Sequence, residues 1–273
     1  MIPQDFISEW KKSAPWLETY QVEQDLIISR ALVEMFNNSL LAENLAFRGG
    51  TALFKLHMTP LRYSEDIDLV QVHAGSIGSV MDTIQEKLNS WLGTPKRSRS
   101  EGRVTLTYRM LSEEEVPLKL KIEINTREHF AILGFEKRNF TVRSRWFSGS
   151  APILTYQLDE LLGTKLRALY QRKKGRDLFD LWKALTTTEA QPKRVIDCFL
   201  QYMDHENHKV SRAEFEQNLL EKINDPRLFN DIKSVLIEDG GFNFHIATEF
   251  VMKQLVPLIP GEPWQGKAQE QII

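Results

Sequence analysis

Cysteine is almost absent from this sequence, with Cys198 the only one among 273 residues. A single cysteine cannot form an internal disulfide, which excludes the small disulfide-stapled secreted domains and is typical of a reducing cytoplasm. The neighbours Val195, Ile196, Phe199 and Leu200 are apolar. We therefore expect Cys198 to lie in the core on a helix, and not to be a reactive thiol.

The sequence also lacks a long apolar run and an N-terminal leader. No uninterrupted apolar stretch approaches the roughly 20 residues that a membrane-spanning helix needs. The segment from Met1 to Phe6 has no basic region followed by an apolar run, so we expect no signal peptide. Together these absences predict a cytoplasmic protein that does not bind a membrane.

Neither sign of charge is in excess, because 35 lysines and arginines face 37 acidic residues. Any contact with nucleic acid must therefore come from a local basic patch and not from the overall charge. The 42% of hydrophobic residues is enough for one large domain or two small ones with a real core. The sequence shows no Walker-type phosphate loop and suggests no Ser-His-Asp or Cys-His arrangement.

What the sequence does contain is a mixed α/β pattern that extends to about residue 156. Residues 104–109 and 118–124 alternate strictly between apolar and polar side chains, which is the strongest strand signal in the chain. Apolar residues also interleave with Asp66 and Asp68, which predicts a strand with both acids on one face. The other elements predicted in this half are helices at 4–13, 18–39 and 76–92, a strand at 45–47 that ends in a glycine turn, a helix from residue 51, and edge strands at 140–146 and 152–155.

After residue 157 the strand signals disappear. Helices are predicted at 157–171, 176–185, 192–207, 211–222 and 244–256, with loops at 224–226 and 239–241. The sequence therefore predicts an α/β (α+β) fold, in which residues 1–156 form a domain with a mixed sheet and residues 157–273 form a helical domain.

The chemistry is concentrated in a strand, glycine turn and helix unit followed by the two acids. Asp66 and Asp68 are two residues apart on a strand, so their carboxylates lie side by side and repel each other unless a cation neutralises them. Mg²⁺ favours one or two carboxylates together with phosphate oxygens. Gly49 and Gly50 allow the backbone to approach a phosphate, and the helix that starts near Thr51 offers free N–H groups. The alternative is a pair of aspartates that cap turns.

These segments resemble the signature of the AbiEii/AbiGii-type toxin nucleotidyltransferases, which include the MenT toxins and belong to the DNA polymerase β-like superfamily. The resemblance is carried by Gly49-Gly-Thr-Ala-Leu53 and Ser64-Glu-Asp-Ile-Asp-Leu69. It continues through Glu123, Lys165-Leu-Arg-Ala-Leu169 and Arg172-Lys-Lys-Gly-Arg-Asp-Leu-Phe-Asp-Leu181, and so covers roughly residues 45–185. It implies that residues 1–156 form the nucleotidyltransferase domain and that the helical domain contributes to the cleft.

The sequence departs from the wider superfamily at the glycine turn. Gly50 stands where many members have a serine that helps to hold the terminal phosphate. The segment between Gly50 and Asp66 is also longer than in minimal members. We therefore expect Thr51, Ser64 or backbone groups to bind the phosphates in this chain.

The resemblance implies a third acid, Glu123, on a neighbouring strand. In that position it would bind metal and take a proton from the attacking hydroxyl group. Lys119, Lys121 and Asn125 share a strand face with Glu123, so a solvated polar face is the alternative interpretation.

The helical half contributes two further residues to the implied site. Lys165 resembles the lysine of the family that contacts phosphate, and Asp177 resembles the acid of the family's Arg-Asp motif. They lie on consecutive predicted helices joined by a short link, so we expect them to lie close together and to act as one unit. Asp180 lies three residues after Asp177, on a neighbouring surface position of the same helix. Ordinary salt bridges between helices are the alternative.

Two basic segments are candidates for binding RNA. One comprises Lys96, Arg97, Arg99 and Arg103, and the other Arg167, Arg172, Lys173, Lys174 and Arg176. Within the second segment we assign Arg172, Lys173 and Lys174 to RNA. A solvated loop or helix end is the usual meaning of such segments, and this alternative stays open.

The resemblance implies a toxin that transfers a nucleoside monophosphate from an NTP to RNA, at a tRNA 3′ end, with two Mg²⁺ (or Mn²⁺) ions held by Asp66, Asp68 and Glu123. It also implies a cognate antitoxin, as in abortive infection systems. Two other functions remain open: an enzyme of the same superfamily that modifies a small molecule such as an antibiotic, and a non-catalytic regulator that binds NTP.

Overall fold

The computed structural model describes residues 2–233, 235–236 and 242–266. The chain divides into two compact units, the first comprising residues 1–161 and 235–238 and the second residues 162–234 and 239–273. The loop predicted at 239–241 lies outside the described residues. Within the described part of the chain, no helix is both long and apolar enough to cross a bilayer.

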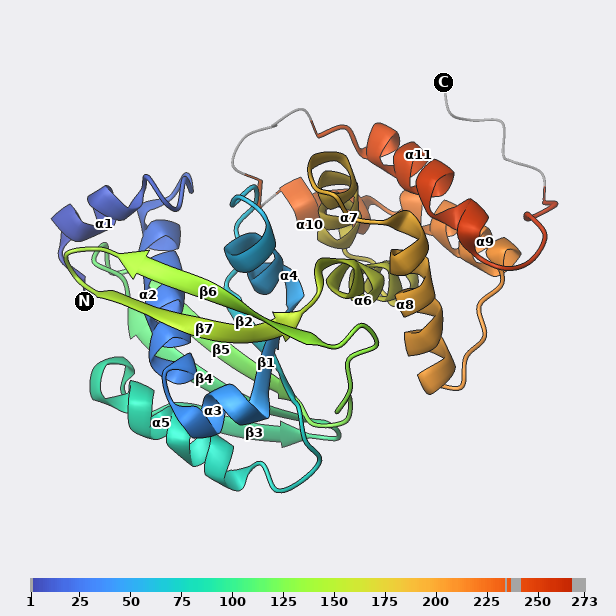
Figure 1. Ribbon diagram of the computed structural model, residues 1–273. Coiled ribbons are helices and arrows are strands. Elements are labelled where there is room, and N and C mark those ends of the chain that lie inside the picture. The colour runs from blue at the N-terminus through green and yellow to red at the C-terminus, as the bar shows by residue number, and fades with distance from the viewer. Residues whose placement is uncertain (1, 234, 237–241, 267–273) are drawn as a thin grey trace. The chain divides into compact units, whose positions relative to one another are not determined.

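A seven-stranded mixed sheet is the frame of the first unit (Figure 1). Its strand order is β3-β4-β5-β2-β1-β7-β6. The pairs β1–β7 and β2–β5 are parallel, and the other neighbours are antiparallel. The strands are β1 Leu45–Arg48, β2 Asp66–Gln71, β3 Lys96–Ser100, β4 Arg103–Leu111, β5 Pro117–Asn125, β6 Phe135–Arg143 and β7 Ser148–Tyr156.

The period-two pattern of the sequence puts one face of this sheet in the main core, while the opposite face carries polar side chains and a smaller buried apolar cluster around Val70. Four apolar side chains of β5 are at most 4% exposed: Leu118, Leu120, Ile122 and Ile124. Ile67 of β2 and Leu106 of β4 lie opposite Ile122 and continue the buried row. The strands predicted at 104–109 and 118–124, and the strand that carries the two acids, are confirmed. The acids therefore lie on the polar face.

The helices of the first unit are α1 Gln4–Trp10, α2 Thr19–Phe36, α3 Ser39–Asn44, α4 Gly49–Ala52, the π-helix η1 Leu53–His57 and α5 Gly78–Leu92. Helix α2 packs against β5, β6 and β7, and α5 packs against β4. Their apolar side chains join those of the sheet in one core. The prediction of one helix over 18–39 is wrong at its end, because α2 stops at Phe36 and Asn38 caps a new helix by accepting a hydrogen bond from Leu41 N at 3.2 Å.

The edge strands differ from the prediction. Residues 96–100 form β3, although their sequence is wholly polar and all five are exposed. Pairing with β4 supplies the hydrogen bonds that the sequence pattern does not indicate. Strand β6 begins at Phe135 and ends at Arg143, so the prediction of a strand at 144–146 is wrong. There the chain turns, and the Ser144 hydroxyl accepts a hydrogen bond from Trp146 N at 3.1 Å.

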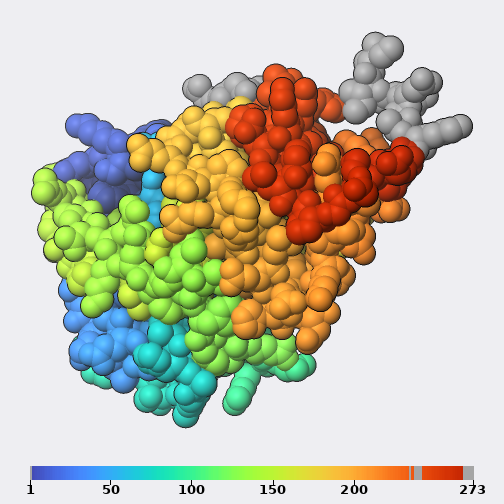
Figure 2. Space-filling model, turned by 45° about the vertical axis from the view of Figure 1, so that its right-hand side comes forward, coloured from blue at the N-terminus to red at the C-terminus, as the bar shows by residue number. Residues whose placement is uncertain are grey.

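The second unit is helical, and its helices are α6 Leu158–Gln171, α7 Gly175–Thr187, α8 Pro192–His205, α9 Arg212–Ile223, α10 Pro226–Lys233 and α11 Phe244–Gln254, followed by the 3-10 helix η2 Val256–Leu258. Helix α10 was not predicted beyond the loop at 224–226. Helices α6 and α8 approach closely at Gly163, where an added Cβ would lie 2.6 Å from Cys198 Cβ. Cys198 is fully buried, as predicted. In Figure 2 the red C-terminal segment lies against the orange helices of the same unit, where η2 contacts α9.

Candidate active site

The two acids on β2 lie in the centre of the polar sheet face. Asp66 lies opposite Lys121 of β5, and Asp68 lies opposite Glu123. Paired residues of neighbouring strands project to the same face, and so do residues two apart on one strand. The structure thus brings Asp66, Asp68 and Glu123 together within the first unit.

Asp66 is a largely buried acid with acidic neighbours that the nearby lysines do not fully offset. Its burial raises the pKa of this carboxyl group, and the nearby charges of Asp68 and Glu65 raise it further, to about 6. Lys121 and Lys119 oppose the shift without cancelling it. A cation that binds to the pair stabilises its charged form, because it offsets both the cost of burying the charge and the repulsion between the two acids.

The glycine turn is built around Asp68. Gly49 has φ +80°, and a Cβ added there would lie 2.4 Å from Asp68 Oδ2. A side chain at this position would therefore strain the backbone and collide with the acid. Gly50 follows in the first turn of α4 and is buried. Gly49 is thus needed because a side chain there would displace the Asp68 carboxylate. The sequence pattern alone did not indicate this requirement.

Thr51 and Ser64 connect the start of α4 to β2. The Thr51 hydroxyl donates to Asp66 O at 2.6 Å and lies 2.8 Å from Ser64 Oγ. Since the Thr51 proton is directed at the carbonyl oxygen, the Ser64 hydroxyl is the donor of the second hydrogen bond. Thr51 is only 2% exposed. Its hydroxyl group therefore fixes the backbone of Asp66, and the N–H groups of the helix start are the better phosphate donors in this turn.

Glu123 is in a different electrostatic state from Asp66. Its carboxylate contacts the ammonium group of Lys121 and accepts a hydrogen bond from Arg103 Nη1 at 3.4 Å. Two cations therefore already neutralise the third acid. Among the described residues no cluster of three or more His, Cys, Asp or Glu side chains is arranged around a common metal position. Of the three acids, Glu123 has close ion-pair partners, whereas Asp66 and Asp68 have none among the described residues.

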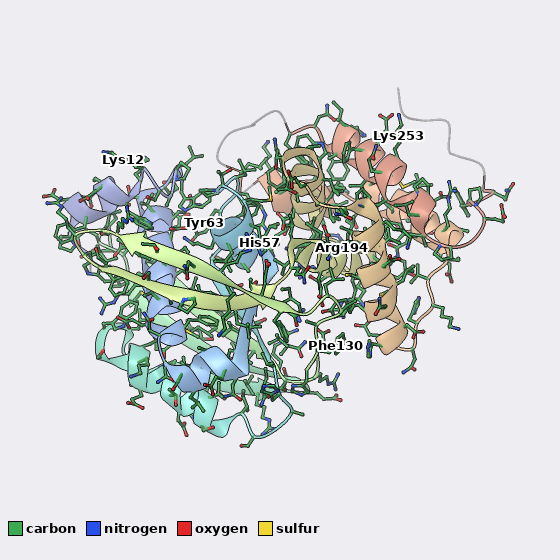
Figure 3. All side chains as sticks on the ribbon, in the orientation of Figure 1. Lys12, His57, Tyr63, Phe130, Arg194 and Lys253 are labelled. Atoms are coloured by element: carbon green, nitrogen blue, oxygen red, sulfur yellow. The ribbon has the colours of Figure 1, made fainter. Side chains whose placement is uncertain are left out.

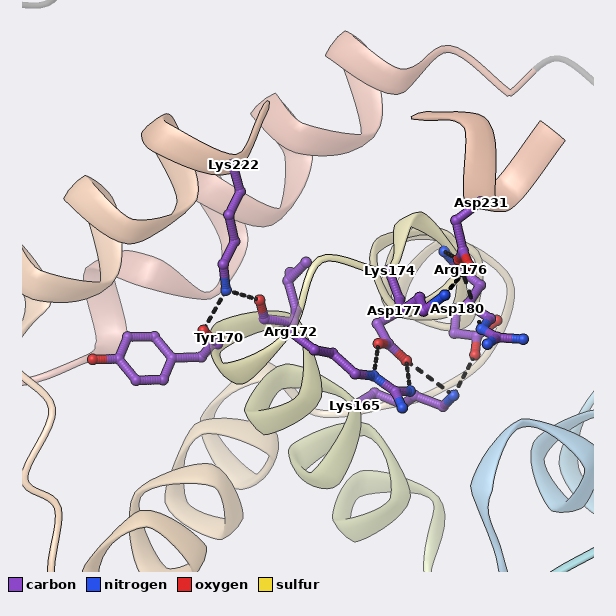
Figure 4. A network of polar contacts seen from close by, with 10 residues as sticks. Lys165, Tyr170, Arg172, Lys174, Arg176, Asp177, Asp180, Lys222 and Asp231 are labelled. Carbon is purple, nitrogen blue, oxygen red and sulfur yellow. Dashed lines mark hydrogen bonds and ion pairs between the residues drawn. The ribbon is translucent and has the colours of Figure 1, made fainter. Parts of the chain in front are cut away.

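The second unit has its own buried charge cluster, which Figure 4 shows. Lys165 Nζ on α6 lies 3.3 Å from Asp177 Oδ1 and 2.8 Å from Asp180 Oδ2 on α7. Arg172 binds Asp177 with two nitrogens, at 2.7 Å from Nε and 3.0 Å from Nη2. Both aspartates have no exposed surface. The expected proximity of Lys165 and Asp177 is confirmed, and Asp180 completes the cluster.

The cations of this cluster decide the protonation state of Asp177. Complete burial alone would raise the pKa of the carboxyl group, but Lys165 and Arg172 more than offset that effect and hold the pKa below its ordinary value. The carboxylate is therefore charged and compensated.

The basic segment after α6 is also paired with acids. Lys173 Nζ lies 2.9 Å from Asp225, and Lys174 Nζ lies 3.0 Å from Asp231. Arg176 shares Asp231 at 3.6 Å. These acids belong to α10 and the residue before it, more than 50 residues along the chain, so no local sequence pattern could have paired them.

Lys222 of α9 is a further buried cation that the sequence analysis missed. It donates to the backbone oxygens of Leu169, at 2.7 Å, and Tyr170, in the last turn of α6 (Figure 4). Burial, together with the charge of Lys173, lowers the pKa of Lys222 to about 8. A cation at the C-terminal end of a helix binds carbonyl groups that have no partner within it.

Comparison with known proteins agrees with this fold. The family model described as the nucleotidyl transferase AbiEii toxin of type IV toxin–antitoxin systems matches residues 30–241, well over half of the chain. No curated protein matches the sequence.

Among solved structures, the nucleotidyltransferase toxin MenT4 (Rv2826c) from Mycobacterium tuberculosis H37Rv is similar, with 15% sequence identity and a TM-score of 0.64 over 94% of this chain and 90% of that one. JHP933 from Helicobacter pylori has 16% identity and a TM-score of 0.54, over 88% of this chain and 93% of that one. At these identities the likeness shows a shared fold.

Proposed function

Since the chain belongs to the AbiEii family of nucleotidyltransferase toxins of type IV toxin–antitoxin systems, we propose that it transfers the nucleoside monophosphate of an NTP to the 3′ end of an RNA such as a tRNA, with Asp66 and Asp68 as the metal-binding pair. The observation that carries this proposal is the geometry of the pair, two carboxylates on one strand face beside the glycine turn, with no ion-pair partner among the described residues. A cognate antitoxin is the partner that the family implies.

The two aspartates fit a divalent cation. Mg²⁺ commonly binds one or two protein carboxylates and completes its coordination with phosphate oxygens and water, so it requires no cage of three protein acids. Mn²⁺ suits the same oxygen ligands. When bound, the cation neutralises the triphosphate and the charge that develops on it. The two-metal form of the proposal also needs Glu123, which would then exchange Lys121 and Arg103 for the second ion.

The reaction is a displacement at phosphorus. The acceptor hydroxyl oxygen forms a bond to the α-phosphorus, and the bond from that phosphorus to the oxygen bridging to the β-phosphate breaks. Pyrophosphate leaves with the electron pair of the broken bond, and the hydroxyl proton goes to Glu123 or to water. The protein contributes position and charge, not a covalent intermediate.

Backbone groups of the glycine turn are the proposed phosphate ligands. The first N–H groups of a helix have no acceptor within it, and those of Gly49, Gly50 and Thr51 stand at the start of α4. The hydrogen bond between the Thr51 and Ser64 side chains connects the start of α4 to the segment before β2. The role of these residues is thus to hold the backbone beside the acids.

Lys165 and Asp177 are retained as proposed members of the nucleotide site on the family resemblance. In the second unit Lys165 already binds two carboxylates, so a phosphate group would have to compete with them. Arg172, Lys173 and Lys174 are proposed RNA contacts on the same basis, although each of these three has an acidic partner. Because of these ion pairs, we expect Lys165 to bind phosphate, and the basic segment to bind RNA, more weakly than the sequence alone predicts.

The proposal is tested by incubating the full chain with each labelled NTP in turn, Mg²⁺ and total RNA. We expect label on RNA from the wild type and none from Asp68→Asn. Asp204→Asn, an exposed aspartate on α8, makes the same chemical change outside the site and should label RNA normally.

The other outcomes are equally informative. Label on a small molecule would replace the RNA acceptor, and tight NTP binding without transfer would indicate a regulator. Equal labelling by wild type and Asp68→Asn would remove the acid pair from the mechanism.

A further inference from the structure

The sheet face that carries the acid pair differs on the two sides of that pair. Towards β1 and β7 it is covered by a cluster of four apolar side chains that are at most 1% exposed: Ala46, Val70, Tyr156 and Leu161. Towards β5, β4 and β3 the same face is polar and largely exposed. The acid pair therefore lies at the border between an apolar half and a polar half of this face.

The strand register shows which side chains share the polar half with the acids. Lys121 of β5 pairs with Asp66 of β2 on one side and with Thr107 of β4 on the other. Thr107 in turn pairs with Lys96 of β3. Directly paired residues project to the same face, and each strand adds roughly 5 Å, so this row runs about 14 Å from Asp66 to the edge of the sheet.

The rows beside it add further cations. Arg109 and Lys119 form a directly opposed pair on β4 and β5, two residues from Thr107 and Lys121. Arg103 lies on β4, two residues before Thr105, which pairs with Glu123. We call the five cations of this face the basic platform: Lys96, Arg103, Arg109, Lys119 and Lys121.

The chain itself compensates little of this charge. Of the residues that β3, β4 and β5 place on this face, all of them described, Glu123 is the single acid, and it contacts Lys121 and Arg103. The other three cations are exposed and have no ion-pair partner among the described residues: Lys96, Arg109 and Lys119. Five cations against one acid leave a surplus of four positive charges beside the acid pair.

The pair of Arg109 and Lys119 is a second indication of an anionic ligand. Like charges in directly opposite positions destabilise a sheet, and the fold nevertheless keeps two cations in this position. An anion that binds between the two side chains removes their repulsion and gains two charge-assisted contacts.

The shape of the platform favours a chain of phosphates. A single anion cannot contact cations that are spread over three strands, whereas a nucleic-acid backbone carries one charge per nucleotide. The strands place no aromatic side chain on this face, so bases have no surface on which to stack. Contacts of this kind position a nucleic acid without reading its sequence.

We propose that the basic platform binds the phosphodiester backbone of the acceptor RNA next to its reacting 3′ end, without preference for base sequence. The RNA leaves the acid pair across β5 and β4, because the apolar cluster covers the other half of the face. Arg109 and Lys119 share one phosphate, and Lys96 contacts another nearer the edge of the sheet. This inference rests on the proposed transfer to RNA.

The test measures binding of a synthetic tRNA acceptor stem with its single-stranded 3′ end to the full chain, without NTP, across a salt series. The Lys96→Ala, Arg109→Ala double variant should weaken binding about tenfold or more and lower the salt slope by about two. Lys119 stays in place, because its charge lowers the pKa of Asp66 and its loss would disturb the acid pair. Folding should be intact, since Arg109→Ala removes a repulsion.

The matched control is Lys137→Ala, Arg143→Ala, which removes one exposed lysine and one exposed arginine from β6, beyond the apolar cluster in the strand order. It should leave the affinity and the salt slope unchanged. Equal effects of the two double variants would overturn the proposal, as would a strong dependence of wild-type affinity on the base pairs of the stem.

The position of the contact is tested by replacing one phosphodiester at a time with a neutral methylphosphonate, inward from the 3′ end. At one or two linkages near that end the wild type should lose about fivefold in affinity, the effect of one phosphate contact. The Lys96→Ala, Arg109→Ala variant should show no loss at those linkages. Equal losses in both proteins at every linkage would contradict the assignment.

A failure of the proposed function is separable from a failure of this inference. If the wild type labels RNA but the Lys96→Ala, Arg109→Ala variant keeps its RNA affinity, only the basic platform is wrong. Loss of antitoxin binding by that variant, with RNA affinity retained, would assign the surface to an acidic protein partner instead. If the wild type labels no RNA with any NTP, the transfer reaction itself is wrong.

Discussion

The two aspartate pairs of this protein stand in opposite electrostatic states. Asp66 and Asp68 on β2 repel each other, and the pKa of Asp66 is raised to about 6. Asp177 and Asp180 on α7 are fully buried, yet Lys165 and Arg172 hold the pKa of Asp177 below its ordinary value. Cations of the chain itself thus neutralise the second pair, whereas the first has no ion-pair partner among the described residues.

The same contrast separates the two basic segments. Lys173 and Lys174 each have a carboxylate partner on or just before α10, whereas Arg99 on β3 has none among the described residues. A cation with an acidic partner contributes less to the potential that a phosphate experiences. Sequence runs of similar composition therefore differ in what they offer to RNA.

The largest effect is expected from a substitution in the Asp66 and Asp68 pair. Asp68→Asn should reduce the transfer rate by about a thousandfold or more, because it removes a ligand of the neutralising cation. It should not lower stability, since it also removes a repulsion. Initial rates with labelled NTP and a urea unfolding curve measure the two quantities. Full activity of this variant, or of the wild type in EDTA, would contradict the assignment.

The second prediction concerns the buried charge cluster of Lys165, Arg172, Asp177 and Asp180 in the second unit. Asp177→Ala should lower the free energy of unfolding by about 3 kcal/mol, the lower end of the cost of breaking a buried ion pair, because Arg172 loses its buried partner while Lys165 keeps Asp180. Lys193→Ala breaks an exposed pair on α8 and should change stability by less than about 0.5 kcal/mol.

A double-mutant cycle sharpens this prediction. If Lys165 and Asp177 form one unit, the stability losses of Lys165→Ala and Asp177→Ala should not add. Transfer rates measured below the unfolding transition then decide whether Lys165 also contacts phosphate. Strictly additive losses would show that the two residues act independently.

The third prediction uses pH to separate the two units. His57, labelled in Figure 3, is buried in the first unit, and burial together with Arg138 lowers its pKa from 6.5 to about 4. A depressed folded-state pKa stabilises the fold above pH 6.5, and this stability is lost as the pH falls towards 4, by about 3 kcal/mol. The pKa of Asp177 lies below 3.8, so the second unit should keep its charge cluster over this range.

Hydrogen exchange at pH 7 and pH 4.5, corrected for intrinsic rates, measures this difference. Asp66, whose pKa is raised, titrates in the opposite sense in the same unit, so the contribution of His57 is the difference between the wild type and His57→Gln. Peptides of the first unit should lose more protection on acidification in the wild type than in His57→Gln. Equal pH dependence of the two proteins would show that His57 does not control acid stability.

The smallest expected effect concerns the paired basic segment. The Lys173→Ala, Lys174→Ala double variant should lower the salt slope of RNA binding by less than the value of about one expected for each unpaired cation that contacts a phosphate, because both lysines are already neutralised. Measuring the wild type, the double variant and Arg99→Ala in one salt series provides the comparison. A decrease of about two for the double variant would restore the RNA-binding role assigned from the sequence.

The parts of the site that follow from a backbone period were predictable. Period two placed Asp66 and Asp68 on one strand face, and a short link between helices brought Lys165 to Asp177. Contacts between distant segments were not predictable. The pairing of Lys173 with Asp225 spans 52 residues, and β3 forms from a polar sequence only because β4 pairs with it.

Because α6 and α8 pack closely at Cys198, the thiol of this residue can report when the two helices of the second unit separate. Cys198 is fully buried against Gly163, so a thiol reagent can reach it only when the two helices separate. Because the chain holds no second cysteine, each modified molecule records one opening of that contact. The rate of modification under native conditions then gives the free energy of local opening without any engineered label, and addition of an NTP or of the antitoxin would show directly whether either ligand closes this unit.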